Sequence, residues 1–271
     1  MRSADVQWAI RSRTSTQGCR PSVRRMLFRD VAEGIHRLEL AHTNTYLVET
    51  GDRLLVVDAG LPAVWPHLLL AVHDLGYSPD RVEALLLTHG HFDHVGTAAR
   101  MHREWGTPVY VHPGDRDLAA HPYSYRPQQN RFGFVVAHPG GLRPLSRMLL
   151  AGAATVDGID EVETLESRAD VPGNPWIIET PGHTDGHVAL HFADRDAVIA
   201  GDALVTFDPY TGGIGPRVVA PAATADMATA VASLDLLVDT EAQHVLPGHG
   251  PSWSRGVRAA VAQARRAAGA A

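Results

Sequence analysis

The chain has 271 residues, of which 45% are hydrophobic, and its formal net charge is −6. This apolar content is enough to bury a core, which excludes global disorder, and the length fits one large domain or two small ones. All 24 basic residues are arginine, so a lysine Schiff base and a lysine general base are both excluded.

The composition also limits the compartment and the partners that we expect. Cys19 is the only cysteine, so no intrachain disulfide can form, and we expect a cytoplasmic protein. The chain shows no basic stripe and no apolar run of about 18 residues, so we expect neither a nucleic-acid partner nor a membrane span. We expect a small-molecule substrate, with a homodimer as the possible assembly.

The first 25 residues differ from the rest of the chain. They contain six arginines and a single acidic residue, Asp5, and they lack the continuous apolar stretch of a secretory signal. We therefore expect residues 1–25 to be a poorly ordered N-terminal extension and residues 26–271 to form one domain.

The first half of this domain combines strand patterns with helix patterns. Alternating or continuous apolar runs predict strands at 35–40, 45–49, 54–58, 82–87 and 108–112. Apolar residues at helical spacing predict helices at 68–75 and 95–105, which end at Gly76 and Gly106.

The segment 113–158 breaks this rhythm because prolines and aromatic residues alternate in it. Such stretches inside a compact domain usually form surface loops or lids. We expect an insert of loop or short helices on the surface, and a cover over the substrate is the alternative.

The second half returns to regular patterns. It predicts strands at 176–180, 187–192, 197–200 and 244–246, and helices at 222–237 and 257–268. Two halves of similar make-up, each with strands and helices, favour helices layered over two sheets that face each other.

The most informative stretch follows the predicted strand 82–87. Three imidazoles and a carboxylate occur within six positions, at His89, His91, Asp93 and His94. Such groups are costly to bury at the end of an apolar strand unless they share a partner. Imidazole nitrogens and carboxylate oxygens are ligands that zinc and related metals favour, so this stretch predicts a metal site.

Three later turns repeat the pattern of a strand that ends in a candidate ligand. His183 and His187 follow strand 176–180, Asp202 follows strand 197–200, and His249 follows the strand at 244–246. Each turn contains glycine, which allows close backbone approach or a positive φ. Together with the first cluster, they predict one site at a common edge of the sheets.

This order of motifs resembles the metallo-β-lactamase-fold superfamily, from about Thr45 to His249. The resemblance implies an α/β (α+β) fold, a four-layer αββα sandwich of two mixed β-sheets flanked by helices. It also implies two metal ions at one edge of the sandwich. One would be bound by His89, His91 and His183, the other by Asp93, His94 and His249, and Asp202 would bridge them.

The resemblance assigns supporting roles to further residues. Asp58 and His187 match positions that contact the ligands. Independently of the resemblance, the positions of Tyr46, His112, Phe207 and Tyr210 along the chain make them candidates for the substrate pocket. Burial in the core is the alternative for Tyr46 and Phe207, and Tyr210 could donate a hydrogen bond to a substrate carbonyl.

Seven ligands are too many for one tetrahedral zinc ion, whereas two zinc ions about 3.5–4 Å apart would use them all. Iron or manganese could replace zinc. Two nearby cations make hydroxide available near pH 7, and Asp93 and Asp202 would be the catalytic carboxylates that orient and bridge. The nucleophile is then a hydroxide between the metals, which agrees with the missing lysine and catalytic thiol.

Several activities occur in this superfamily. β-Lactamases typically carry cysteine or serine where this chain has Asp202, and glyoxalase II commonly binds glutathione through lysine. The sequence therefore favours a hydrolase of a small ester, thioester or lactone, of the thioesterase or lactonase kind. The alternatives are a mononuclear iron oxidoreductase that resembles persulfide dioxygenases, and β-lactam hydrolysis as a weak side activity.

Overall fold

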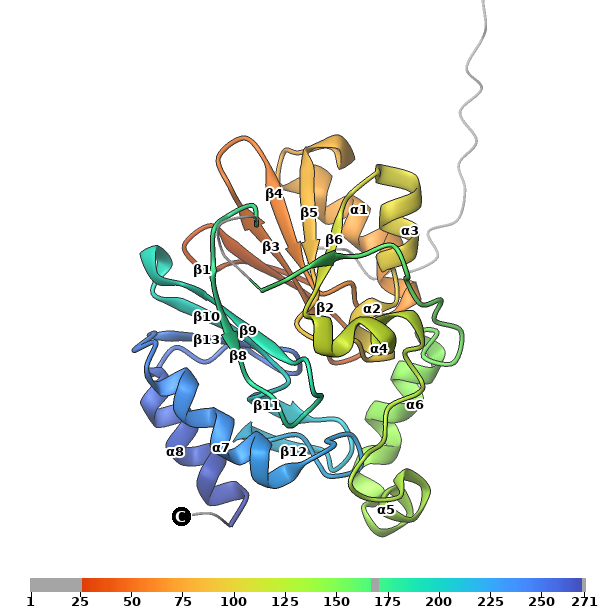
Figure 1. The fold of residues 1–271 in the computed structure, drawn as a ribbon, viewed down its shortest axis with the longest axis vertical. Coiled ribbons are helices and arrows are strands. Elements are labelled where there is room, and N and C mark those ends of the chain that lie inside the picture. The colour runs from red at the N-terminus through yellow and green to blue at the C-terminus, as the bar shows by residue number, and fades with distance from the viewer. Residues whose placement is uncertain (1–25, 167–170, 270–271) are drawn as a thin grey trace, which may run out of the picture.

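The structure is a computed structural model, and it describes residues 26–166 and 171–269. The N-terminal extension predicted at 1–25 lies outside the described residues. Two β-sheets face each other, and helices cover the outer face of each (Figure 1). This is the αββα sandwich that the sequence predicts.

The first sheet has seven strands in chain order. Strands β1 to β4 are antiparallel, and the pairings β4–β5, β5–β6 and β6–β7 are parallel, so the sheet is mixed. The strands are β1 (Leu27–Ala32), β2 (Ile35–Leu40), β3 (Thr43–Glu49), β4 (Leu54–Val57), β5 (Val82–Leu86), β6 (Val109–Val111) and β7 (Glu163–Thr164).

The second sheet has the strand order β13-β10-β9-β8 and is also mixed, because β10 pairs parallel to β13 and antiparallel to β9. Its strands are β8 (Trp176–Glu179), β9 (Val188–Phe192), β10 (Ala197–Gly201) and β13 (His244–Pro247). A separate hairpin of β11 (Val205–Asp208) and β12 (Gly213–Arg217) follows β10. Neither this hairpin nor β1 is among the strands predicted from the sequence.

The side chains of β4 show how the layers are built. Successive residues of a strand point to opposite faces. Leu54 and Val56 pack toward α1 (Trp65–Asp74) and α3 (Ala98–Trp105), whereas Leu55 and Val57 join the core between the sheets. On the far side, α7 (Met227–Val238) and α8 (Val257–Ala267) pack on the second sheet. All four strand residues are fully buried, so β4 lies at the centre of the sandwich.

The helix predicted at 95–105 is divided in the structure. Its place is taken by α2 (Phe92–Val95) and α3, with a break at Gly96 and Thr97. Gly96 N donates to Gly60 O at 2.8 Å, and a Cβ atom at Gly96 would lie only 2.3 Å from that oxygen. The break therefore lets α2 pack against the loop that follows β4.

The insert at 113–158 is largely helical and not a plain loop. It contains α4 (Arg116–Ala120), α5 (Arg131–Ala137) and α6 (Leu142–Leu150), and α5 and α6 lie beside the β11–β12 hairpin (Figure 1). Leu145 contacts two apolar clusters, one with Tyr210 and one with Leu61. Proline and glycine between the helices keep each of them short. In the described part of the chain, no helix has the length and apolar character needed to cross a membrane.

Candidate metal centre

Strand ends from both sheets meet at one edge of the sandwich. Strand β5 leads into His89 and His91, and α2, which begins at the next residue, carries Asp93 and His94. The second sheet contributes from three turns, with His183 between β8 and β9, Asp202 after β10 and His249 after β13. All seven of these residues are at least 94% buried.

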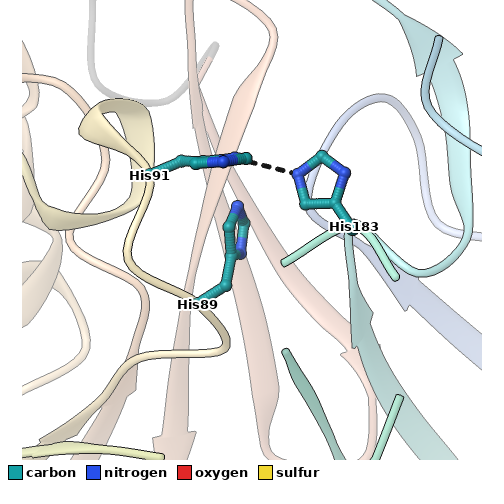
Figure 2. A group of neighbouring side chains, drawn as sticks. All are labelled: His89, His91 and His183. Atoms are coloured by element: carbon teal, nitrogen blue, oxygen red, sulfur yellow. Dashed lines mark hydrogen bonds between the residues drawn. The ribbon is translucent and has the colours of Figure 1, made fainter. Parts of the chain in front are cut away.

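The side chains form three overlapping groups whose ligand atoms lie within 4.8 Å of one another. Two of these groups are the ligand sets that the resemblance implies: the first is His89, His91 and His183 (Figure 2), and the second is Asp93, His94 and His249. The third joins His89 and His94 to Asp202.

Asp202 lies between the first two groups. Its Oδ2 is 3.4 Å from His183 Nε2 and 3.2 Å from His249 Nε2, and its Oδ1 is 3.7 Å from His94 Nε2. Within the groups, His183 Nε2 is 2.9 Å from His91 Nδ1, and His249 Nε2 is 3.3 Å from Asp93 Oδ2. The structure thus brings together all seven of the predicted ligands.

The hydrogen bonds at the other ring nitrogens define which nitrogen can accept a cation. His249 Nδ1 donates to His42 O at 2.9 Å, and His94 Nδ1 donates to Asp58 Oδ2 at 2.8 Å. His183 Nδ1 lies 3.2 Å from Thr224 Oγ1, whose own proton goes to Val219 O. In the neutral form of each ring the proton lies on Nδ1, so the Nε2 lone pair would face the cluster once any second proton is released.

His89 is held in the same way. Its Nδ1 lies 3.0 Å from Thr88 Oγ1, and that hydroxyl donates to Asp58 Oδ2 at 2.9 Å. Asp58 therefore supports one ligand from each group, His89 through Thr88 and His94 directly. The resemblance implied that Asp58 contacts the ligands, and these hydrogen bonds join it to two of the candidate ligands.

Several buried atoms of the cluster have no hydrogen-bond partner among the described residues. They include His89 Nε2, His94 Nε2 and Asp202 Oδ1. A buried acceptor without a partner costs about 1–3 kcal/mol, and such atoms are rare in folded proteins. A divalent cation would satisfy all of them, so the donor set fits zinc or a related metal.

The protonation states agree with metal binding. Burial lowers the pKa of His89 and His183 well below the ordinary value, and it lowers the pKa of His91 to about 4. These rings are neutral at pH 7, as metal ligands must be. Burial opposes ionisation of Asp202 as well, but the neighbouring His249 and His94 hold its pKa well below the usual range.

His249 and His94 show the opposite shift. Burial disfavours the charged form of both rings, but neighbouring carboxylates outweigh it. Asp202 raises the pKa of His249 well above the ordinary value. Asp58 and Asp93 raise the pKa of His94 to about 9. Protons therefore occupy positions that cations would take, and binding of a metal would release them.

His187 supports the site from behind Asp202. Its Nε2 accepts a hydrogen bond from Asp202 N at 2.9 Å, and its Nδ1 donates to Thr180 Oγ1 at 2.7 Å. Both ring nitrogens are occupied, so His187 does not offer a ligand atom. Burial lowers its pKa to about 3, which keeps it neutral.

The four pocket candidates lie in different places. Tyr210 lines a cavity of about 10 Å³ bounded by ligands of both groups, which is room for roughly one water molecule. Tyr46 is fully buried and donates to Pro247 O at 2.7 Å, so it fixes the turn before His249. Phe207 stacks on His42, and His112 Nδ1 accepts from Gly114 N. Tyr46, Phe207 and His112 do not line this cavity or the larger one beside it.

Tyr125 was not singled out from the sequence, yet it covers the cluster. Its ring lies 4.1 Å from the His91 ring, and its hydroxyl is 3.4 Å from the Tyr210 hydroxyl. It lines both the small cavity and a second cavity of about 360 Å³, and His183 lines both as well. The insert thus contributes a side chain that contacts the cluster, and its role as a substrate cover stays a prediction.

Asp115 is the second residue that the sequence analysis missed. A Gly-Asp pair, Gly114-Asp115, comes shortly after β6, and another, Gly201-Asp202, ends β10; this repetition is the signal that could have revealed it. Its side chain is fully buried, although burial raises its pKa, and it contacts two of the turns that carry ligands.

Comparison with known proteins agrees with this geometry. The chain is 28% identical over 234 residues to the probable metallo-hydrolase YflN of Bacillus subtilis, with 82% of this chain and 85% of YflN covered. It is 29% identical over 211 residues to the probable metallo-hydrolase YqgX of the same organism, with 77% and 85% covered.

Solved structures give the same result. TTHA1623, whose crystal structure is of a di-iron-bound form, superimposes with a TM-score of 0.58 at 29% identity, over 82% of this chain and 95% of that chain. TTHA1429 of Thermus thermophilus, a metallo-beta-lactamase family protein, shares the fold with a TM-score of 0.60 at 23% identity, over 84% and 75%. The sequence model of the Metallo-beta-lactamase superfamily matches residues 38–249, most of the chain, and the protein therefore belongs to this superfamily.

Proposed function

We propose that this protein is a dinuclear metal-dependent hydrolase that acts on a small ester, thioester or lactone. The observation that carries the proposal is the pair of candidate ligand groups on either side of Asp202, with buried polar atoms that have no hydrogen-bond partner among the described residues. Two ions, zinc in our proposal with iron or manganese as substitutes, would supply a hydroxide near neutral pH and polarise the substrate carbonyl.

The chain's own residues would orient this chemistry. The carboxylate of Asp93 is ionised at pH 7, because His94 and His249 outweigh the effect of burial and lower its pKa. One of its oxygens would bind an ion, and the other could accept a hydrogen bond from the hydroxide and orient it. The Tyr210 hydroxyl is protonated, since burial raises its pKa well above the ordinary value, and it can donate a hydrogen bond to the carbonyl oxygen.

The cavities support a small substrate. The one that adjoins His183 has a volume of about 360 Å³, at the lower end of the range for small-molecule sites. Tyr125 and His183 line both this cavity and the small one at the candidate ligands, so a substrate carbonyl in the larger cavity would pass the Tyr125 ring to reach them.

Two alternatives remain as outcomes of the test. The di-iron form of TTHA1623 makes iron the first substitute to examine, and a mononuclear iron oxidoreductase of the persulfide dioxygenase kind would need one ion only. BLEG-1, a B3 metallo-beta-lactamase with 22% identity, shares the fold, so β-lactam hydrolysis is included as a side activity.

The test combines metal analysis with a substrate panel. The protein is freed of metal with a chelator, reloaded with zinc, iron or manganese, and assayed on p-nitrophenyl esters, acyl thioesters, lactones and a chromogenic β-lactam. Two ions per chain and metal-dependent hydrolysis are expected. One iron per chain with oxygen uptake on a persulfide would favour the oxidoreductase, and no metal-dependent turnover on any substrate would refute the proposal.

A further inference from the structure

Asp115 joins two of the turns that carry candidate ligands. Its Oδ2 accepts hydrogen bonds from Gly90 N at 2.8 Å and from Thr184 Oγ1 at 2.7 Å, and its Oδ1 accepts from Gly186 N at 2.7 Å. The side chain is 0% exposed, so water does not replace any of these donors. One carboxylate therefore bridges a turn of the first sheet and a turn of the second.

The hydrogen-bond donors to Asp115 belong to residues next to the candidate ligands in the chain, and not to the ligands themselves. Gly90 separates His89 from His91, and Thr184 directly follows His183. A shift of the Asp115 carboxylate would therefore move the backbone that carries these three imidazoles, although it touches none of them.

The two turns pack in close contact with the backbone that carries Asp115. A Cβ atom at Gly186 would lie 2.4 Å from Asp115 N, and one at Gly90 would lie 2.7 Å from Ala119 N. Both turns thus rest directly on the backbone from Gly114 to Ala119. The three hydrogen bonds and these contacts determine the spacing of the turns together.

The second ligand group is held by other residues. His94 is fixed by Asp58, and His249 by the carbonyl of His42, while Tyr46 holds the preceding Pro247. None of these contacts involves Asp115 or its three partners.

We infer that Asp115 is a positioning residue for one metal ion and not for the other. It fixes the spacing of His89, His91 and His183, and so determines the affinity of that group for its ion. The affinity of the second group, Asp93, His94 and His249, does not depend on Asp115. This inference rests on the proposed binding of two metals.

The test uses Asp115→Asn, which keeps the shape of the side chain but turns an amide NH2 toward at least one of the three donors. Zinc-loaded protein is dialysed against a chelator series, and the remaining zinc is counted by mass spectrometry. One equivalent should leave at a chelator concentration roughly 10- to 100-fold lower than in the wild type, as for other residues that support metal ligands. The second equivalent should leave at the wild-type concentration.

Matched variants separate this role from general destabilisation. Asp117→Asn removes an exposed carboxylate two residues further on, and it should leave both equivalents unchanged. Tyr46→Phe should weaken the equivalent that Asp115→Asn spares. Anomalous scattering from crystals of the one-zinc form of Asp115→Asn should locate the remaining ion beside Asp93, His94 and His249.

Three results would overturn the inference: unchanged retention in Asp115→Asn, parallel loss of both equivalents, or a remaining ion on the His89, His91 and His183 group. If Asp115→Asn does not fold, Thr184→Val removes one hydrogen bond only and should shift the same equivalent by a smaller factor; no shift would count against the role. A wild type that binds a single ion would instead refute the dinuclear proposal itself.

Discussion

A methyl group at Gly248 would press directly on the centre of the proposed metal site. Its Cβ atom would lie 2.1 Å from Asp202 Oδ1 and 2.9 Å from His94 Cε1, whereas ordinary contacts are 3.4–4 Å. The backbone is clamped, because Gly248 N donates to Gly201 O at 2.7 Å and Gly248 O accepts from Asn44 N at 2.8 Å. In Gly248→Ala the Asp202 carboxylate must therefore move by more than about 1 Å, the difference between the contact distances.

A misplacement of about 1 Å in a catalytic group costs roughly 100-fold in rate, or about 2.7 kcal/mol of transition-state stabilisation. We expect kcat/KM of Gly248→Ala to fall by about this factor on the best substrate of the panel, with weaker zinc retention. Gly133→Ala is the control, because the nearest neighbour of its Cβ would be Asn130 Oδ1 at 3.9 Å. Wild-type kcat/KM and two bound ions in Gly248→Ala, with a normal melting temperature, would refute the importance of this geometry.

Three further results are expected. His91→Ala should lose zinc and turnover, because His91 belongs to a candidate ligand group. His138→Ala should keep both, since the His138 ring stacks on Phe134 away from the cluster. Equal metal content in the two variants would contradict the ligand assignment. Chelation should lower the melting temperature, because an ion that binds only the folded state stabilises it by about 2.7 kcal/mol at 100 times its Kd; a melting temperature that is independent of zinc would argue against binding. In the chelated protein, burial lowers the pKa of His187 to about 3 in the folded state. The unfolded state therefore binds a proton at this ring between pH 6.5 and 3 that the folded state does not bind. The free energy of unfolding should fall by up to about 1.4 kcal/mol per pH unit as the pH drops from 6.5 toward 3, and this effect should be absent above pH 6.5. His187→Gln should make the acid side of this profile shallower in urea titrations, and an unchanged slope would exclude His187 as the group responsible.

The positions of the candidate ligands along the chain could be predicted because the end of each strand is marked by a change from apolar residues to a polar turn. The apolar run from Val82 to Leu86 stops at a polar and glycine-containing turn, and so does the one from Ala197 to Gly201. Parallel strands end at the same edge of a sheet, so turns such as those after β10 and β13 had to lie close together. The burial pattern of the strands and the helices that cover them follow from the same apolar periodicity.

What the sequence could not supply were contacts between segments far apart in the chain. Asp115 lies 25 residues from Gly90 and 69 from Thr184, and nothing in its immediate neighbourhood indicates either partner. Tyr125 looks like one more aromatic residue in a segment rich in proline. The hairpin of β11 and β12 was missed for a local reason, because glycine and proline in Gly213–Arg217 weaken the strand pattern.

The position of the cluster also explains how the fold tolerates it. Buried lone pairs such as His89 Nε2 and Asp202 Oδ1 oppose folding by about 1–3 kcal/mol each while no cation binds them. Burial of the apolar core between the two sheets, which is fully buried around Leu55, Val57 and Leu190, offsets this unfavourable free energy. Since the ligands come from the strand ends of both sheets, a bound ion would join the two sheets at this edge in addition to satisfying the lone pairs. Loss of metal should therefore loosen the turns around His183 and His249 before it affects the central strands, and hydrogen exchange at these turns should rise first on chelation.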